Sequence, residues 1–289
     1  MQGISTVNFH LIKNCNYCCE YCYARFEDVK ERQLAKAEQQ ELIKKLAESK
    51  RFRKINFAGG EPTLIPYLPE LVKYAKSLGL ETSIVTNGSK IDAEWIKNIS
   101  PFLDILALSV DTLNYDTNIK IGSNQRGKVL DIDKVKEIAE ACHYSGIKLK
   151  INTVVSSFNK DEKLTDFINE ITPFRWKILQ ATQVKGQNDK NFHKISVTSE
   201  DFSLFCKNNQ IELSDEIKAV CESNDLITGS YVMVDFAGRF FDNSEHKHNY
   251  SDSILEVGVK AAFSQINVDD KKFAQREGNY SVFNEKNVL

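Results

Sequence analysis

Four of the seven cysteines lie within eight residues of one another, between Cys15 and Cys22. Cys15, Cys19 and Cys22 have the spacing Cys-x3-Cys-x2-Cys, which brings three thiolates onto one tight loop. A cluster held by four cysteines has protein sulfur on every iron. Three cysteines leave one iron of a [4Fe–4S] cube open, and an open metal position is where chemistry can take place. The loop is therefore a candidate site for a cluster with one open iron.

A structural zinc site is the main alternative for this loop. Zinc prefers four ligands, usually from two separated pairs, and the loop forms one knuckle without a second half. His10 could complete a zinc tetrad, so the alternative stays open. Cys18 is predicted to be a bystander, because adjacent cysteines cannot both reach one cube comfortably. The remaining three cysteines are scattered and are predicted to be core thiols.

The bulk composition is that of a soluble globular protein. The 289 residues are 42% hydrophobic and 27% charged, with a formal net charge of −2. This net charge does not indicate direct binding to nucleic acid or to an anionic membrane. The chain begins without a basic-then-apolar leader and has no apolar run of membrane-spanning length. Because an iron–sulfur cluster needs a reducing compartment, we expect a cytoplasmic protein.

Short β-type runs alternate with helical patterns over the first 184 residues. Strands are predicted near 5–12, 53–58, 81–86, 104–110, 147–155 and 174–182, and helices near 33–50, 66–79, 91–99, 132–145 and 161–171. This alternation implies parallel strands joined by right-handed crossovers. The predicted fold is α/β, a partial (β/α)6 barrel over residues 1–184 with a C-terminal extension.

Residues 185–289 are expected to pack on the barrel and close it, as part of one structural domain. Residues 185–200 are predicted to form a loop, followed by helices near 198–209 and 213–222. The segments 231–235 and 239–242 flank Ala237-Gly238 and predict a hairpin or an extended excursion. A further helix is predicted from Ser251 to Ala262, capped by Ser251 or Asp252.

The predicted strands place polar residues on one face. Lys54 and Asn56 alternate with Ile55 and Phe57, and the same pattern holds for Asn8 and His10, Ser109 and Asp111, Lys150 and Asn152, and Arg175 and Lys177. The apolar face must meet the helices, so the polar face points inward. Buried cations are costly unless anions offset them. Cations on three strands therefore favour a triphosphate ligand, with carboxylates of the protein as the alternative partners.

With Tyr21 just before its last cysteine, the cysteine loop resembles the radical S-adenosylmethionine (SAM) superfamily. The resemblance implies that the open iron chelates SAM and that an electron cleaves it to a 5′-deoxyadenosyl radical. Gly59-Gly60-Glu61-Pro62 is similar to the element that holds the SAM amino group in that superfamily. Asn87 and Ser109, at the ends of strands, fit the ribose and carboxylate of SAM. Arg126 is a further candidate for the SAM carboxylate.

Seven segments together resemble the viperin family, in its order and spacing: residues 7–22, 54–62, 83–89, 103–111, 148–159, 173–180 and 253–259. The resemblance implies conversion of a nucleoside triphosphate (CTP, UTP or GTP) into its 3′-deoxy-3′,4′-didehydro analogue, a chain terminator. The steps it implies are abstraction of the 4′ hydrogen, loss of the 3′ hydroxyl as water, and delivery of an electron and a proton. It also implies a flavodoxin- or ferredoxin-type electron donor.

Site residues follow from this resemblance, position by position, and it implies that Cys15, Cys19 and Cys22 ligate the cluster. Tyr21, Gly60, Glu61, Asn87, Ser109 and Arg126 correspond to SAM contacts. The nucleotide pocket corresponds to Asn8, His10, Lys54, Lys150, Asn152, Arg175, Lys177 and Arg276. Tyr231 falls where the family has its candidate hydrogen donor, although half-buried packing would also explain a tyrosine there. Tyr280 lies in the tail expected to close over the nucleotide.

The chain also departs from the animal members of the family. It lacks their N-terminal amphipathic membrane helix, so we expect a soluble form, most simply a prokaryotic member in antiphage defence. An insertion between residues 120 and 129 complicates the assignment of Arg126. Two alternative functions are a radical enzyme that modifies a peptide or RNA, and a non-catalytic iron–sulfur or zinc protein. The inward cations disfavour the first, and the three-cysteine loop with residues 59–62 disfavours the second.

Overall fold

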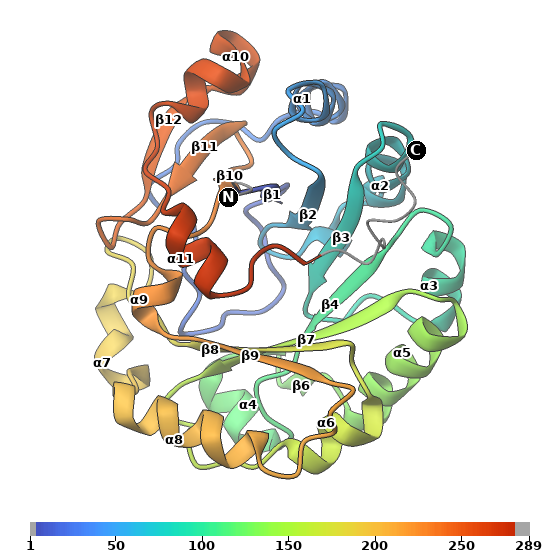
Figure 1. The fold of residues 1–289 in the computed structure, drawn as a ribbon, viewed down its shortest axis with the longest axis vertical. Coiled ribbons are helices and arrows are strands. Elements are labelled where there is room, and N and C mark those ends of the chain that lie inside the picture. The colour runs from blue at the N-terminus through green and yellow to red at the C-terminus, as the bar shows by residue number, and fades with distance from the viewer. Residues whose placement is uncertain (1–3, 281–289) are drawn as a thin grey trace.

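A curved sheet of ten strands organises the computed structural model, which describes residues 4–280 (Figure 1). Its centre holds six parallel strands in chain order: β1 (Thr6–His10), β2 (Lys54–Ala58), β3 (Glu81–Thr86), β4 (Ile105–Ser109), β7 (Lys148–Val155) and β8 (Arg175–Gln180). These are the six strands that the sequence predicts, and a parallel order is expected when helices connect successive strands. The α/β prediction is confirmed.

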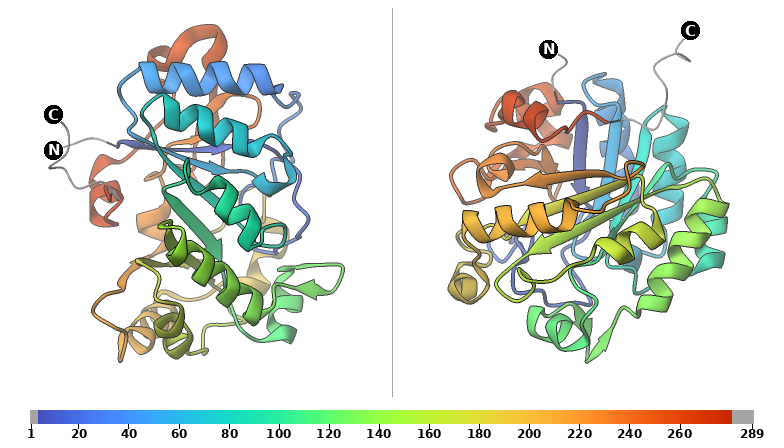
Figure 2. Two further views of the ribbon diagram at one scale, coloured as in Figure 1. Left: turned by 90° about the vertical axis from the view of Figure 1, so that its right-hand side faces the viewer. Right: turned by 60° about the horizontal axis from the view of Figure 1, so that its bottom comes forward.

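The connecting helices form an outer arc around this sheet (Figures 1 and 2). They are α1 (Lys36–Glu48), α2 (Leu68–Ser77), α3 (Ala93–Ile99), α5 (Ile132–Tyr144) and α6 (Thr165–Ile171). Helix α5 shows why they form here: the Asp131 side chain accepts a hydrogen bond from the Asp133 amide, and Val135, Ile138 and Cys142 bury one stripe. Apolar strand residues such as Trp176 complete the core between the layers.

The C-terminal part adds strands to both edges of the sheet. Strand β9 (Lys218–Glu222) pairs parallel to β8, and β10 (Met233–Val234) pairs parallel to β1. Strands β11 (Arg239–Asp242) and β12 (Asn249–Ser253) then continue the sheet antiparallel. The predicted hairpin around residues 237–238 is confirmed, and the domain boundary at residue 184 stays a prediction.

One predicted helix is wrong and another is wrong in its start. The helix predicted near 213–222 does not form: residues 213–217 are turn and coil, and residues 218–222 form β9, because a short apolar run satisfies either period and the open edge of β8 offers backbone partners. Helix α10 begins at Ile254 rather than at residue 251, because the residues before it pair with β11 as β12. The loop predicted over residues 185–200 contains a short 3-10 turn and α7 (Phe192–Ile195).

One segment that the sequence did not predict packs against the cysteine loop. Helix α4 (Tyr115–Ile121) is followed by a small hairpin of β5 (Asn124–Gln125) and β6 (Lys128–Val129). The Cys18 amide donates to the Gly122 carbonyl at 3.2 Å, and the Glu20 amide donates to the Ile121 carbonyl at 2.8 Å. The segment therefore supports the loop from outside the sheet.

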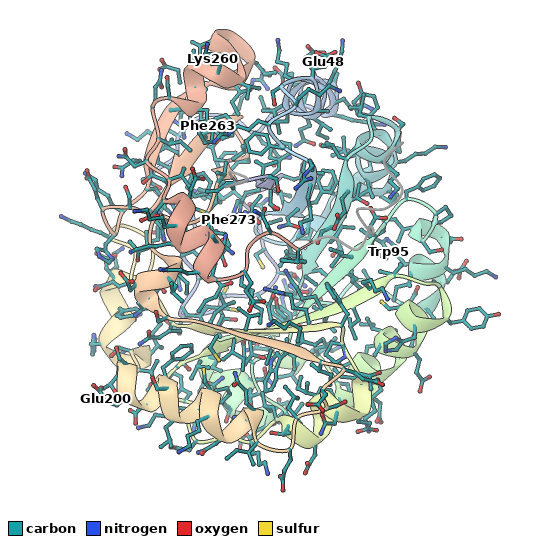
Figure 3. All side chains as sticks on the ribbon, in the orientation of Figure 1. Glu48, Trp95, Glu200, Lys260, Phe263 and Phe273 are labelled. Carbon is teal, nitrogen blue, oxygen red and sulfur yellow. The ribbon has the colours of Figure 1, made fainter. Side chains whose placement is uncertain are left out.

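The remaining helices are α8 (Ser199–Gln210), α9 (Asn224–Ile227), α10 (Ile254–Phe263) and α11 (Asp270–Gln275). Figure 3 places Phe273 of α11 near the middle of the view, whereas Glu48, Trp95, Glu200 and Lys260 lie on the outer rim. Phe273 is buried in the main hydrophobic core. Within residues 4–280, none of the helices has the length and hydropathy that crossing a bilayer would need.

Candidate active site

A cavity of about 320 Å³ lies on the inner face of the parallel strands. Its wall includes most of the residues singled out from the sequence: Asn8, His10, Cys15, Cys19, Tyr21, Cys22, Gly60, Glu61, Asn87, Ser109, Lys150, Asn152, Lys177, Tyr231 and Arg276. Strand parity explains this gathering. Lys150 is buried toward the cavity, while Leu149 and Ile151 are buried toward the helices.

The cysteine loop forms one end of this cavity. Cys15, Cys19 and Cys22 all line it, whereas Cys18 is exposed and does not. The Tyr17 amide donates to the Cys15 sulfur at 3.4 Å, and the Cys22 amide donates to the Cys19 carbonyl at 3.1 Å. The three thiols thus face the same cavity, and hydrogen bonds within the loop stabilise its conformation.

Two glycines let other segments approach the loop closely. A Cβ atom on Gly60 would lie 2.2 Å from the Asn14 carbonyl oxygen, and one on Gly122 would lie 2.3 Å from the Cys18 carbonyl oxygen. Gly122 also has a φ of 85°, in the left-handed region that favours glycine. Any side chain at either position would displace the loop.

The donor set of the loop fits a [4Fe–4S] cluster. Burial raises the pKa of the Cys15 thiol to about 11 and also raises those of Cys19 and Cys22. The thiols are therefore protonated at neutral pH and would release protons on binding iron. Within residues 4–280, no three His, Cys, Asp or Glu side chains are grouped to hold a single metal ion.

Glu61 occupies the wall beside the loop in a network of hydrogen bonds. Its Oε1 accepts from the Thr63 amide at 3.0 Å and from the hydroxyls of Thr63 and Thr86 at 2.6 and 2.7 Å. Within residues 4–280, its Oε2 accepts a hydrogen bond only from the Asn87 amide, at 2.8 Å. A carboxylate oxygen has a second lone pair, so Oε2 can accept an ammonium group of a ligand.

Asp111 forms a second buried carboxylate at this end, and the Tyr21 hydroxyl donates to it. The Asp111 carboxylate also accepts from the Val154 amide at 2.8 Å. Burial raises the pKa of Asp111 to about 6, and these hydrogen bonds oppose the shift. The aromatic residue before Cys22 is thereby fixed by β4 and β7, which places the end of the cysteine loop against the sheet.

A group of cations forms the opposite end of the cavity. Lys54, Lys150 and Arg175 surround the ring of Tyr280, with their charged groups 3.5, 5.5 and 4.3 Å from the ring centroid. The Lys150 Nζ also donates to the Tyr280 hydroxyl at 3.0 Å. Lys54 and Arg175 do not line the cavity themselves, but Tyr280, which they contact, does. The three cationic side chains therefore converge on Tyr280.

Burial changes the charge balance of these groups. Burial, reinforced by Arg175, lowers the pKa of Lys150 to about 7. Burial also lowers the pKa of Lys177 to about 7, although the Glu222 carboxylate opposes the shift. Lys54 has a lowered pKa for the same reason. An anion placed among these groups would restore their charged forms.

Glu222 is the partner that connects Lys177 with the C-terminal segment. Its Oε1 lies 2.9 Å from the Lys177 Nζ and 3.5 Å from an Arg276 nitrogen. The Tyr231 hydroxyl donates to Glu222 and accepts from Lys177, and the Arg276 guanidinium stacks 3.7 Å from the Tyr231 ring centroid. Burial and Glu222 raise the pKa of Tyr231 well above its usual value, so the phenol keeps its hydrogen.

His10 lines the cavity near β10 and β11. It is 2% exposed and packs against Phe26 and Phe241, with ring centroids 5.3 and 5.5 Å away. Burial, reinforced by His248, lowers the pKa of His10 to about 3, so it is neutral at physiological pH. Neither ring nitrogen has a hydrogen-bond partner in the described part of the chain. Asn152 Oδ1 is similarly unpartnered there.

One predicted SAM contact lies elsewhere. Arg126 is exposed at the tip of the β5–β6 hairpin and is not part of the cavity wall. The structure does not bring Arg126 to the other predicted SAM contacts, and its role in SAM binding stays a prediction. The sequence does not single out Glu222 either, because its pattern predicts a helix near residues 213–222, where the structure has β9. Recognition of the alternating run 218–222 as a strand would have placed Glu222 at its carboxyl end.

Comparisons with known proteins agree with this geometry. A family model described as "Radical SAM superfamily" matches residues 10–171. The chain is 44% identical to an S-adenosylmethionine-dependent nucleotide dehydratase of Lacinutrix mariniflava, over 99% of this chain and 60% of that one. It is 39% identical to a protein of the same name from Flammeovirga pacifica, over 96% of each chain.

Among solved structures, the chain resembles native anSMEcpe with bound AdoMet, with a TM-score of 0.67 and 18% identity over 98% of this chain and 86% of that one. This likeness shows the fold alone. Members of the radical SAM superfamily use a [4Fe–4S] cluster and SAM, for which the cysteine loop and its neighbouring wall supply suitable groups. The chain belongs to the radical SAM superfamily and, within it, to the viperin family of S-adenosylmethionine-dependent nucleotide dehydratases.

Proposed function

We propose that the cavity binds a nucleoside triphosphate and that the enzyme converts it to the 3′-deoxy-3′,4′-didehydro analogue. The observation that carries this proposal is a group of five cations at the end of the cavity opposite the cysteine loop. Lys150, Lys177 and Arg276 line the cavity, and Lys54 and Arg175 contact the ring of Tyr280, which lines it as well. In the described part of the chain their carboxylate partners are Glu81, Glu222 and Glu277, and Glu277 is about half exposed in the tail. This surplus of positive charge suits a polyanion.

The two ends of the cavity have different roles in this proposal. Cys15, Cys19 and Cys22 hold the cluster, and Glu61 accepts the SAM ammonium on Oε2 while Asn87 and Ser109 bind the rest of the amino acid and ribose. When bound, the cluster and SAM supply abstraction of the ribose 4′ hydrogen atom. The cations orient the triphosphate so that its ribose lies between the two ends.

Tyr231 is our candidate for the donor that completes the product. Once the 3′ hydroxyl has left as water, the nucleotide radical needs one electron and one proton, which together equal a hydrogen atom. The raised pKa of Tyr231 keeps its hydroxyl protonated at neutral pH. Its ring lies in the cavity wall, between Lys177 and Arg276. A phenol held in this way can deliver a hydrogen atom to a bound nucleotide.

The biological setting is part of the same proposal. We expect CTP, UTP or GTP as substrate, a flavodoxin- or ferredoxin-type electron donor, and a role in antiviral or antiphage defence through chain termination. The cytoplasm is the proposed location, because thiolate-ligated clusters persist in reducing compartments. The alternative of a peptide or RNA substrate is disfavoured by the enclosed cation group, which offers no broad basic surface.

An anaerobic assay tests the proposed reaction. The reconstituted enzyme is incubated with SAM, dithionite and each of CTP, UTP, GTP and ATP separately, and 5′-deoxyadenosine and nucleotide masses are measured. We expect strong 5′-deoxyadenosine formation with one triphosphate and a nucleotide lighter by one water. If no triphosphate stimulates SAM cleavage above background, the proposed substrate class is wrong.

A further inference from the structure

Glu222 is a buried carboxylate in the cavity region that neither the cluster nor SAM requires. It ends β9, where it pairs in register with Leu179 of β8, and its side chain has no exposed surface. The strand fixes its backbone, so the carboxylate cannot withdraw into solvent. A buried carboxylate without a charged partner would cost much free energy of folding, so the groups that contact Glu222 are needed to keep it there.

Three groups converge on this carboxylate from three different elements. Lys177 comes from β8, Arg276 follows α11, and Tyr231 precedes β10. The Arg276 guanidinium is anchored a second time, because it donates to the Ser230 hydroxyl and carbonyl at 2.9 Å each. Glu222 is therefore the common partner through which the sheet, the tail and Tyr231 are joined.

The groups around Glu222 carry a net positive charge, which favours binding of a further anion. One carboxylate faces two cations, and the Lys177 Nζ lies 4.6 Å from the centroid of the Tyr231 ring. Although burial raises its pKa, Lys177 and Arg276 hold the pKa of Glu222 below its usual value, so it is ionised. It supports the charge of both partners without neutralising the pair. A triphosphate can then bind from the cavity side.

We propose that Glu222 is the positioning residue of the phosphate site, whose carboxylate keeps Lys177 and Arg276 charged and aimed at the triphosphate and holds the Tyr231 hydroxyl between them. The inference rests on the proposed function, because it assumes that the cavity binds a polyphosphate. It adds that phosphate recognition and the orientation of Tyr231 share one carboxylate. Glu222 acts through its partners and does not touch the substrate.

The test measures binding of inorganic tripolyphosphate to the protein without cluster, by calorimetry at pH 6.5 and pH 8.5. Glu222→Gln keeps the size of the side chain but removes the charge that supports protonated Lys177. Loss of one unit of pKa at Lys177 would weaken binding about 10-fold at pH 8.5 and about 3-fold at pH 6.5. A steeper fall of affinity with pH is a signature that mere loss of packing would not produce.

Two further variants make the result specific. In a Lys177→Met background, Glu222→Gln should no longer steepen the pH dependence, because its partner is gone. Asp235→Asn is the matched control: it removes a buried carboxylate that pairs with Arg239 at 2.7 Å outside the cavity wall, and it should leave tripolyphosphate binding unchanged. Glu222→Asp, which retains the charge, should restore much of the high-pH affinity and keeps the test usable if Glu222→Gln is unstable.

The possible outcomes separate this inference from the proposed function. If the wild-type protein binds tripolyphosphate and Glu222→Gln binds equally well at both pH values, the role of Glu222 is wrong and the triphosphate site stands. If the wild-type protein does not bind tripolyphosphate at either pH, the proposed phosphate site fails and the inference fails with it. With loaded enzyme, we also expect Glu222→Gln to form less product per 5′-deoxyadenosine than wild type.

Discussion

The two ends of the cavity have opposite charge balances. At the cysteine end, carboxylates predominate, and Glu61 and Asp111 each accept several hydrogen bonds from the protein. At the cation end, lysines and arginines outnumber the carboxylates that pair with them, and Lys150 contacts a tyrosine hydroxyl rather than a carboxylate. At the first end, the protein itself supplies hydrogen-bond partners for the buried carboxylates. The second end retains a surplus of positive charge, which a bound anion would neutralise.

The ends also differ in which part of the chain builds them. The cysteine end comes from residues 15–22, 59–61, 87 and 109–123, all before residue 184. The cation end needs Glu222, Tyr231, Arg276 and Tyr280 in addition to β2, β7 and β8. The comparison suggests that cofactor binding depends on local motifs and nucleotide binding on long-range packing. The following experiments test this division.

Replacement of a cluster cysteine should have the largest effect. Cys19→Ala removes one of three thiols facing the cavity, so we expect loss of iron, sulfide and activity together. Cys18→Ala is the control at the neighbouring position, where the side chain is exposed and does not line the cavity, and it should spare all three. Iron and sulfide analysis with absorbance spectra decides the matter. Loss of the cluster in Cys18→Ala would overturn the ligand assignment.

Lys150→Met should affect only the cation end. Removing this buried charge should weaken triphosphate binding by roughly 1.5–3 kcal/mol, the range for hydrogen bonds to charged groups, and leave SAM affinity unchanged. Because the lysine is buried without a carboxylate partner in the described chain, the free variant should be as stable as wild type or more so. Calorimetric titrations and thermal melts measure both. An equal loss of SAM affinity would mean that the two ends are not independent.

Nucleotide affinity should fall as pH rises above 7. Lys150 and Lys177 have pKa values of about 7 in the free protein, and a bound polyanion raises them, so binding takes up protons between pH 7 and pH 9. The folding stability of the free protein should change in the opposite direction and increase with pH. Because the folded pKa values lie below those of unfolded lysine, these groups cost stability below pH 7 and the cost disappears as pH rises toward 10. Calorimetry in buffers of different ionisation enthalpy detects the uptake, and pH-independent affinity would contradict it.

The smallest effect is expected at Arg126. Its side chain is exposed on the β5–β6 hairpin, so Arg126→Ala should change SAM affinity less than 2-fold, within the ordinary range for surface substitutions. Equilibrium dialysis with SAM on the reconstituted protein measures this. A 10-fold loss would show that the hairpin closes on SAM when the cofactor binds, and would reinstate the contact predicted from the family.

Much of the fold and of the candidate site could be predicted from the sequence. The six central strands and the five helices between them follow from apolar periodicity, because each strand must bury one face against helices. Parity alone placed Lys54, Lys150, Arg175 and Lys177 inward, and the structure brings their charged groups to one region. The edges of the sheet were less predictable, since residues 218–222 satisfy a helical or an extended period equally well.

The sequence by itself determined the cofactor chemistry that the family implies, because the three cysteines predicted to ligate the cluster lie within eight residues and their spacing needs no distant partner. The Gly59–Pro62 motif and the strand-end residues Asn87 and Ser109 are likewise local. Only the tertiary structure decided how the nucleotide end is balanced. Glu222 meets Lys177, Tyr231 and Arg276 across 54 residues of chain at the widest (222 to 276), and a salt bridge between segments so far apart depends on which edges of the sheet pair and not on any local pattern.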